Sequence, residues 1–167
     1  LLDAKRGDIG STAAAYARAA FDELGAGAVT LSPYLGRDSI APFLAHPGKT
    51  AFVLCYTSNP SAAAIQAFGQ EERLFEHIVR QAMAWGEPGQ IGLVVGATYP
   101  QELARVRELA PSVPLLIPGV GAQGGDAAAT IQAGWRGTRA ADGSIRSSGF
   151  AIVNSSRAIL YASSGDD

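Results

Sequence analysis

Three charged residues near the start of the chain have a spacing typical of acid–base chemistry. Asp3 and Lys5 are two residues apart at the end of a short apolar stretch, and Asp8 follows shortly after. Side chains of a β-strand alternate between its faces, so Asp3 and Lys5 are expected on the same face. Because nearby carboxylates favour the protonated ammonium, Lys5 is predicted to act as a general acid. A cluster of surface salt bridges is the alternative interpretation.

A second candidate is the segment Pro118-Gly-Val-Gly-Ala-Gln123-Gly-Gly-Asp126, which lies between an apolar run and a helical pattern. Glycines let the backbone approach a ligand closely, and the free N–H groups at a helix start favour phosphate. The segment is neither a GxGxxG motif nor a Walker loop. Gln123 is its one long polar side chain and is predicted to hydrogen-bond a base or a phosphate. The alternative is a plain tight turn.

Two further segments follow apolar runs. In Asn154-Ser155-Ser156-Arg157, a guanidinium beside the N–H groups of a helix start suits a phosphate dianion, whereas exposure is the alternative for Arg157 alone. In Thr57-Ser58-Asn59-Pro60, Ser58 either binds a ligand ring or caps the turn at Pro60.

These motifs stand at the ends of short apolar runs that alternate with helical patterns. The runs are residues 1–3, 28–31, 51–56, 91–95, 114–117 and 150–153, and the helical patterns are residues 12–24, 38–44, 71–85, 101–109, 127–133 and 157–161. Continuous Val, Ile and Leu runs predict strands buried on both faces of a parallel sheet with helical crossovers. A complete (β/α)8 barrel needs about 250 residues. The 167 residues therefore predict an open doubly wound sheet or a barrel without about two of its units.

One segment, residues 135–149, breaks this rhythm. It is rich in Gly, Ser, Arg and Asp and shows no periodicity, which predicts a long polar loop. Such a loop is either functional or a tolerated surface insertion.

Composition excludes several classes of protein. The net charge of −2 offers no basic field for nucleic acid, and no apolar run approaches the roughly 18 residues of a membrane span. Cys55 lies in an apolar run and is predicted to be buried and reduced, as suits the cytoplasm. His46 and His77 lack metal-ligand spacing, so no metal site is expected. The first residues resemble no signal peptide and begin as if within a strand, which suggests that a segment precedes them.

Taken together, the stretches DAKRGDIGST, PGVGAQGGD and NSSR resemble the bacterial branch of the orotidine 5'-monophosphate decarboxylase family. Residues 32–39 and 94–100 resemble it too, so the likeness runs from Asp3 to Arg157. The resemblance implies a homodimeric (β/α)8 TIM barrel that converts orotidine monophosphate (OMP) to UMP and carbon dioxide without metal or cofactor, in pyrimidine biosynthesis. Residues 1–167 would form a single partial barrel domain with about six of the eight βα units.

The resemblance also assigns catalytic roles. Lys5 would protonate C6 of the pyrimidine as carbon dioxide leaves, with Asp3 beside it near the departing carboxylate. Asp8, Ile9 and Thr12 match residues that the family contributes across the dimer interface into the partner's site.

Substrate-binding roles follow in the same way. Ser58 matches the residue that binds the amide edge of the pyrimidine, and Pro118 lies in the loop over the ring. Gln123 would bridge base and phosphate. The phosphate would be bound at Ser156 and Arg157.

The chain departs from the family in one respect. The family has an earlier strand with an Asp and another with a Lys, which complete a network of four charges, and neither strand is visible here. We expect the missing strands in a separate chain that completes the barrel at its N-terminal side, in a disordered or uncounted part, or deleted. If they are deleted, the chain alone should be inactive. The alternatives are a magnesium-dependent phosphosugar decarboxylase of the same superfamily and a non-catalytic UMP- or phosphate-binding module. Fusion to an orotate phosphoribosyltransferase also stays open.

Overall fold

The computed structural model describes residues 1–121, 123–139, 142, 144–155 and 160–163, and within them the chain forms a six-stranded parallel sheet. The strands neighbour one another in the order β1 (Leu2–Arg6), β2 (Ala28–Leu31), β3 (Thr50–Tyr56), β4 (Ile91–Val95), β5 (Leu115–Pro118) and β8 (Ala151–Asn154). The first five follow chain order, and each pairs in parallel with the next. This order confirms the predicted strands and parallel pairing, with boundaries that shift by a few residues.

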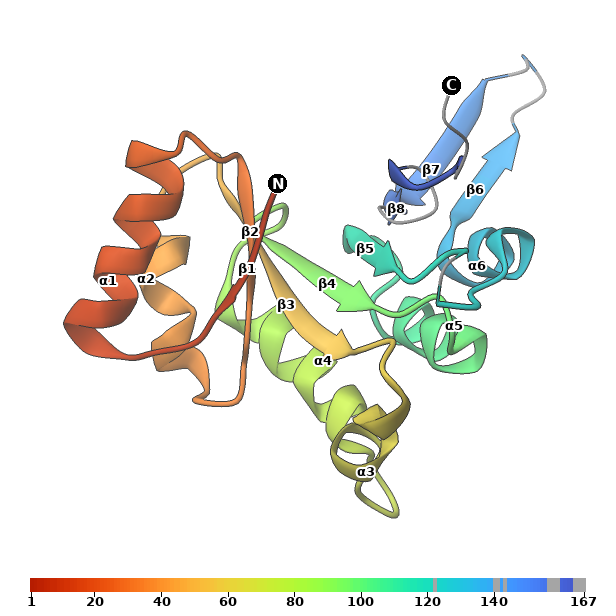
Figure 1. The fold of residues 1–167 in the computed structure, drawn as a ribbon, viewed down its shortest axis with the longest axis horizontal. Coiled ribbons are helices and arrows are strands. Elements are labelled where there is room, and N and C mark those ends of the chain that lie inside the picture. The colour runs from red at the N-terminus through yellow and green to blue at the C-terminus, as the bar shows by residue number, and fades with distance from the viewer. Residues whose placement is uncertain (122, 140–141, 143, 156–159, 164–167) are drawn as a thin grey trace.

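Helices connect the strands and lie along the outer side of the curled sheet (Figure 1). They are α1 (Gly10–Arg18), which a π-helical turn continues to Glu23, α2 (Ala41–Leu44), α3 (Ala63–Gln66), α4 (Leu74–Trp85), α5 (Pro100–Leu109) and α6 (Ala127–Gly134). The short helix α3 was not predicted. Among the described helices, none combines the length and apolarity needed to cross a membrane.

The two faces of the sheet are packed differently. On the outer face, Val53, Cys55 and Leu93 join the large core beneath the helices, so the predicted burial of Cys55 is confirmed. On the inner face, Phe52 packs with Val94 and Leu116 in a smaller cluster. Gly92 stands opposite Phe52 in the register, and a Cβ atom there would lie 2.5 Å from the Phe52 ring. A glycine at this position therefore leaves room for the ring.

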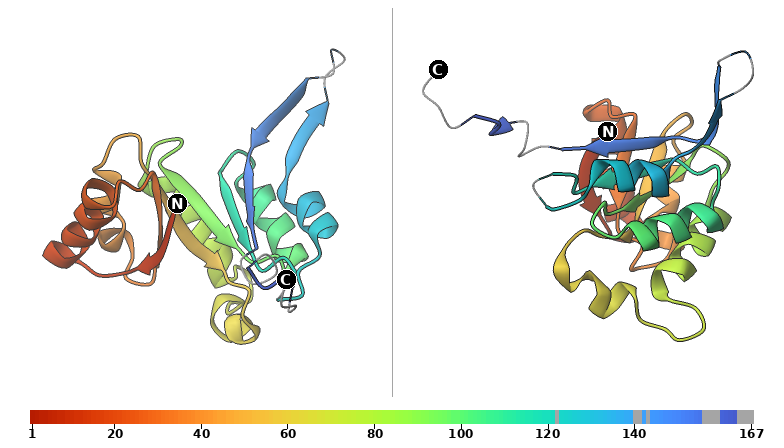
Figure 2. Two further views of the ribbon diagram at one scale, coloured as in Figure 1. Left: turned by 45° about the horizontal axis from the view of Figure 1, so that its top comes forward. Right: turned by 90° about the vertical axis from the view of Figure 1, so that its right-hand side faces the viewer.

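The segment 135–149 differs from the prediction of an irregular loop. It forms an antiparallel hairpin of β6 (Arg136–Arg139) and β7 (Ile145–Gly149), which projects from the sheet (Figure 2). The prediction failed because the strands are composed of Arg, Gly, Thr, Ser and a single Ile, without the alternation of apolar residues that marks a half-buried strand. Their pairing depends on the backbone. The helix predicted at residues 157–161 falls largely outside the described residues.

Arg107 anchors both ends of this hairpin. Its guanidinium is fully buried and donates hydrogen bonds to the carbonyl oxygens of Gly134 and Val113, each at 2.7 Å, and of Phe150 at 3.5 Å. Gly134 precedes the hairpin and Phe150 follows it. Arg107 thus holds the chain where it passes from α6 into the hairpin and where it passes from the hairpin into β8.

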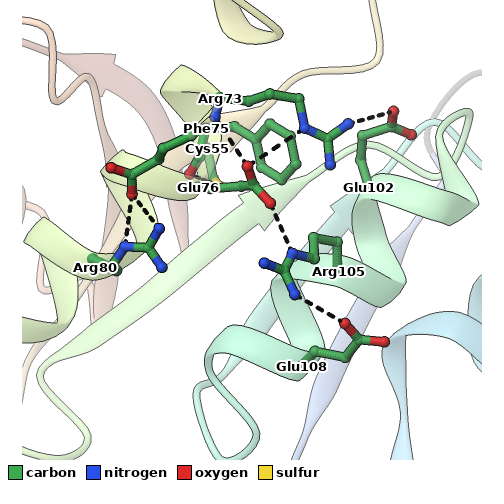
Figure 3. A network of polar contacts seen from close by, with 9 residues as sticks. Cys55, Arg73, Phe75, Glu76, Arg80, Glu102, Arg105 and Glu108 are labelled. Carbon is green, nitrogen blue, oxygen red and sulfur yellow. Dashed lines mark hydrogen bonds and ion pairs between the residues drawn. The ribbon is translucent and has the colours of Figure 1, made fainter. Parts of the chain in front are cut away.

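Glu76 joins α4 to α5 in a network of ion pairs (Figure 3). Its side chain is 8% exposed and accepts hydrogen bonds from Arg105 Nε at 2.7 Å and from the backbone N–H of Arg73 at 2.9 Å. Burial by itself raises the pKa of Glu76, but the hydrogen bonds from Arg105 and Arg73 outweigh burial and lower this pKa to about 2. The carboxylate is therefore charged at every ordinary pH.

Candidate active site

Asp3 and Lys5 meet near the end of β1. Lys5 Nζ lies 2.6 Å from Asp3 Oδ2, and both side chains are about half exposed. The strand is irregular here, since Leu2 pairs with Val29 but Arg6 pairs with Leu31. Lys5 adopts a left-handed backbone conformation with φ of 47°. Simple alternation along a strand is therefore not what brings the ammonium to the carboxylate.

A third side chain completes this cluster. Thr30 in β2 is fully buried, and its hydroxyl donates to Asp3 Oδ1 at 2.8 Å while it accepts from the backbone N–H of Lys5 at 2.9 Å. Sequence reasoning missed Thr30, because a threonine inside a buried strand carries no signal of its own. Partial burial raises the pKa of Asp3, but the hydrogen bonds from Lys5 and Thr30 and the charge of Lys5 lower it overall.

The cluster forms one wall of a cavity of about 610 Å³. Its apolar floor is the inner face of the sheet, with Leu54, Val94, Leu116 and Ile152. Its rim follows the carboxyl ends of the strands and carries the polar residues Asp3, Lys5, Thr57, Ser58, Asn59, Gln123, Asn154 and Ser155, with Pro118 at the end of β5. Residues from β1, β3, β5 and β8 thus converge on one space, as in barrel enzymes, whose sites lie at this end of the strands.

Ser58 and Gln123 meet across this cavity from two different loops. Ser58 Oγ donates a hydrogen bond to Gln123 Oε1 at 2.5 Å. Gly119 has φ of +100°, and a Cβ atom there would lie 2.8 Å from Gln123 Oε1. At Gly96, a Cβ atom would lie 2.8 Å from the backbone nitrogen of Ser58. Glycine at 119 lets the glycine-rich loop approach the loop after β3, and glycine at 96 lets the end of β4 approach that same loop.

The end of β8 closes the rim. Asn154 and Ser155 line the cavity, and Ser155 Oγ donates to the carbonyl oxygen of Val120 at 3.2 Å. Both belong to the NSSR motif, but neither was singled out from the sequence as a site residue. Ser156 and Arg157 lie outside the described residues.

Asp8, Ile9 and Thr12 do not line this cavity. They lie in the loop after β1 and the first turn of α1, where Asp8 Oδ1 accepts from the backbone N–H of Ile9 at 2.8 Å. The side chains of Ile9 and Thr12 are exposed. The structure therefore brings Asp3 and Lys5 together in the cavity, whereas these three residues are not among those that line it.

The described part of the chain contains no group of three or more His, Cys, Asp or Glu side chains placed to hold a metal ion. The chemistry that the described residues offer is that of an ammonium hydrogen-bonded to a carboxylate, together with a set of neutral amide and hydroxyl groups. Such a set suits proton delivery beside a planar polar ligand.

Comparison with known proteins gives consistent matches. Residues 1–166 match the family described as orotidine 5'-phosphate decarboxylase / HUMPS. The chain is 62% identical to the orotidine 5'-phosphate decarboxylase of Variovorax paradoxus over 173 aligned positions, which cover all of this chain and 60% of that relative. The chain thus spans about 60% of the length of the curated relatives that it matches.

Solved structures agree. The UMP synthase of Leishmania donovani superposes with a TM-score of 0.86 at 47% identity, covering 97% of this chain and 35% of that one. The OMP decarboxylase of the same organism gives a TM-score of 0.80 at 46% identity, covering 93% of this chain and 58% of that one. The predicted fold, about six units of a (β/α)8 barrel, is confirmed. The chain belongs to the orotidine 5'-phosphate decarboxylase / HUMPS family.

Proposed function

We propose that the protein containing this chain is an orotidine 5'-phosphate decarboxylase, which converts OMP to UMP and carbon dioxide. The observation that carries the proposal is the contact of Lys5 Nζ with Asp3 in a cavity that Ser58 and Gln123 also line. A proton donor therefore stands within reach of a ligand that hydroxyl and amide groups can bind.

Lys5 carries the chemical step in this proposal. The bond between C6 and the carboxylate of OMP breaks, and its electron pair stays at C6 while carbon dioxide leaves. The Lys5 ammonium stabilises the negative charge that develops at C6 and then transfers its proton to that carbon. Asp3 holds the ammonium in place before the reaction.

The neutral residues of the cavity orient the nucleotide. Ser58 and Gln123 bind the edge of the pyrimidine, and Pro118 packs against the ring. The phosphate lies toward the glycine-rich loop and the end of β8, where Ser156 and Arg157 follow. Contacts with the remote phosphate supply binding energy that helps to orient the ring. The reaction needs no metal or organic cofactor.

The protein acts as a cytoplasmic homodimer in this proposal. Asp8, Ile9 and Thr12 then complete the site of the second subunit, which is consistent with the exposure of Ile9 and Thr12 and with the absence of all three from the cavity of their own chain. The dimer would place Asp8 next to the partner's Asp3–Lys5 pair.

A further segment closes the barrel. Within the described sheet, β1 and β8 are the two edge strands, and the relatives are longer than this chain. We infer that the remaining strands pair with these edges and supply the additional Asp and Lys that the family resemblance implies. On this view residues 1–167 alone bind UMP weakly and do not turn OMP over.

The test is the loss of OMP ultraviolet absorbance without added metal. The protein used is this chain joined to the part of the Variovorax relative that it does not cover, hereafter the joined protein, after cooperative thermal unfolding has shown that it is folded. Turnover that survives EDTA supports the proposal. Turnover only with magnesium would favour a phosphosugar-type enzyme, and UMP binding without turnover would favour a non-catalytic module.

A further inference from the structure

Thr30 connects the two charged residues of the site through one hydroxyl. Its oxygen accepts the backbone N–H of Lys5, and its proton is donated to Asp3 Oδ1. A hydroxyl has a single proton, so the acceptance of the N–H and the donation to the carboxylate fix its orientation. Thr30 is fully buried in β2, so water does not reach its end of these two bonds.

The bond to Lys5 restrains an unusual backbone. Among the described residues other than glycine, Lys5 is the one with positive φ, and this conformation is unfavourable for a long side chain. Such strain persists only where surrounding contacts determine the conformation. The left-handed turn decides the direction in which the Lys5 side chain leaves the strand, so the acceptor of its N–H also decides where the ammonium lies.

The bond to Asp3 restrains the partner of that ammonium. Asp3 accepts a hydrogen bond from the Thr30 hydroxyl on Oδ1 and another from Lys5 Nζ on Oδ2, so each carboxylate oxygen has one donor. With Oδ1 held by β2, Oδ2 is directed at Lys5 Nζ. The backbone of one catalytic residue and the carboxylate of the other are thus set by the same atom.

We propose that Thr30 is a positioning residue of the decarboxylase site. Its hydroxyl holds the Lys5 ammonium next to the Asp3 carboxylate. This inference rests on the proposed function. It predicts an effect on the chemical step rather than on nucleotide binding, because Thr30 itself does not line the cavity.

The competing explanation is that Thr30 only fills space in the core. Thr30→Val keeps the shape and removes the hydroxyl, whereas Thr30→Ser keeps the hydroxyl and removes the methyl group. In the joined protein, we expect Thr30→Val to lower kcat by roughly 10- to 100-fold, as for one hydrogen bond to a charged group, with the affinity for UMP changed less than about threefold. Thr30→Ser should stay within about threefold of the parent.

Each outcome decides a separate question. A Thr30→Val protein with parental kcat, or a Thr30→Ser protein that loses as much as Thr30→Val, overturns the role of the hydroxyl. If Thr30→Val fails to unfold cooperatively, the pair Thr30→Ser and Thr30→Ala repeats the comparison without the methyl group. If the parent does not decarboxylate OMP, the proposed function fails, and a crystal structure of Thr30→Val still tests the positioning. In that crystal structure, an unchanged positive φ at Lys5 and an intact contact between Lys5 and Asp3 would overturn the positioning role of Thr30.

Discussion

Ser58 and Gln123 are separated by 65 positions in the sequence, yet Ser58 Oγ and Gln123 Oε1 form a 2.5 Å hydrogen bond over the cavity. The bond couples the loop after β3 to the glycine-rich loop after β5. In the proposed function both residues bind the pyrimidine, and their contact holds the site ready for it.

The first prediction concerns this pair. Ser58→Ala in the joined protein should weaken UMP binding by roughly tenfold, the effect of about one lost hydrogen bond. Ser61→Ala is the matched control, because Ser61 is exposed three residues further along the chain and is not among the residues that line the cavity. Titration calorimetry measures both. Equal affinities for the two variants would remove Ser58 from the binding site.

The second prediction separates charge from proton delivery at Lys5. Lys5→Arg keeps a positive charge beside Asp3, but a guanidinium does not give up its proton readily. We expect kcat to fall at least about 100-fold while UMP affinity changes less than about threefold. The loss of OMP absorbance and UMP calorimetry are the two measurements. A variant with near-parental kcat would exclude Lys5 as the proton donor.

The third prediction concerns stability and acid. The pKa of Glu76 is lowered to about 2, so its contribution to the free energy of unfolding is complete above the ordinary Glu pKa near 4.5. The contribution is lost as pH falls from 4.5 toward 2. Glu76→Gln should therefore cost about 2 kcal/mol at pH 7, and the difference from the parent should shrink in acid.

The control for Glu76 is Glu108→Gln. Glu108 is exposed and meets Arg105 at 3.3 Å, and such surface pairs contribute about 0–1 kcal/mol (Figure 3). Urea unfolding of the joined protein at pH 3, 5 and 7 compares the two variants. A Glu76→Gln difference that does not depend on pH would contradict the low pKa of this carboxyl group.

The fourth prediction concerns Arg107. Arg107→Met keeps the apolar part of the side chain but leaves buried carbonyl oxygens, among them those of Gly134 and Val113, without this donor. The expected cost is about 3 kcal/mol in the free energy of unfolding. Because Phe150 leads into β8, UMP affinity should fall as well. Thermal unfolding with and without UMP tests both effects. An unchanged unfolding midpoint in Arg107→Met would mean that the hydrogen bonds of Arg107 make no net contribution to the free energy of unfolding.

The sequence by itself determined the order of the strands and the motifs that follow them. Local runs such as residues 91–95, with continuous Val, Ile and Leu, predicted buried parallel strands because they have no polar side to expose. The motifs that contain Asp3, Lys5 and Gln123 were located directly after such runs, and in the structure the three residues line one cavity at the carboxyl ends of the parallel strands. Burial of Cys55 followed from its apolar neighbours.

Only the tertiary structure decided how these residues are held. The left-handed turn at Lys5 and its acceptor Thr30 depend on the pairing of β1 with β2, which no local pattern encodes. The hairpin of β6 and β7 forms through backbone bonds between residues with weak strand preference. Arg107 and Glu76 carry charges that sequence reasoning assigns to the surface, yet both are buried with partners that lie far along the chain. Contacts between distant segments, rather than local periodicity, therefore set the geometry of the cavity with Asp3 and Lys5 and of the sheet that carries it.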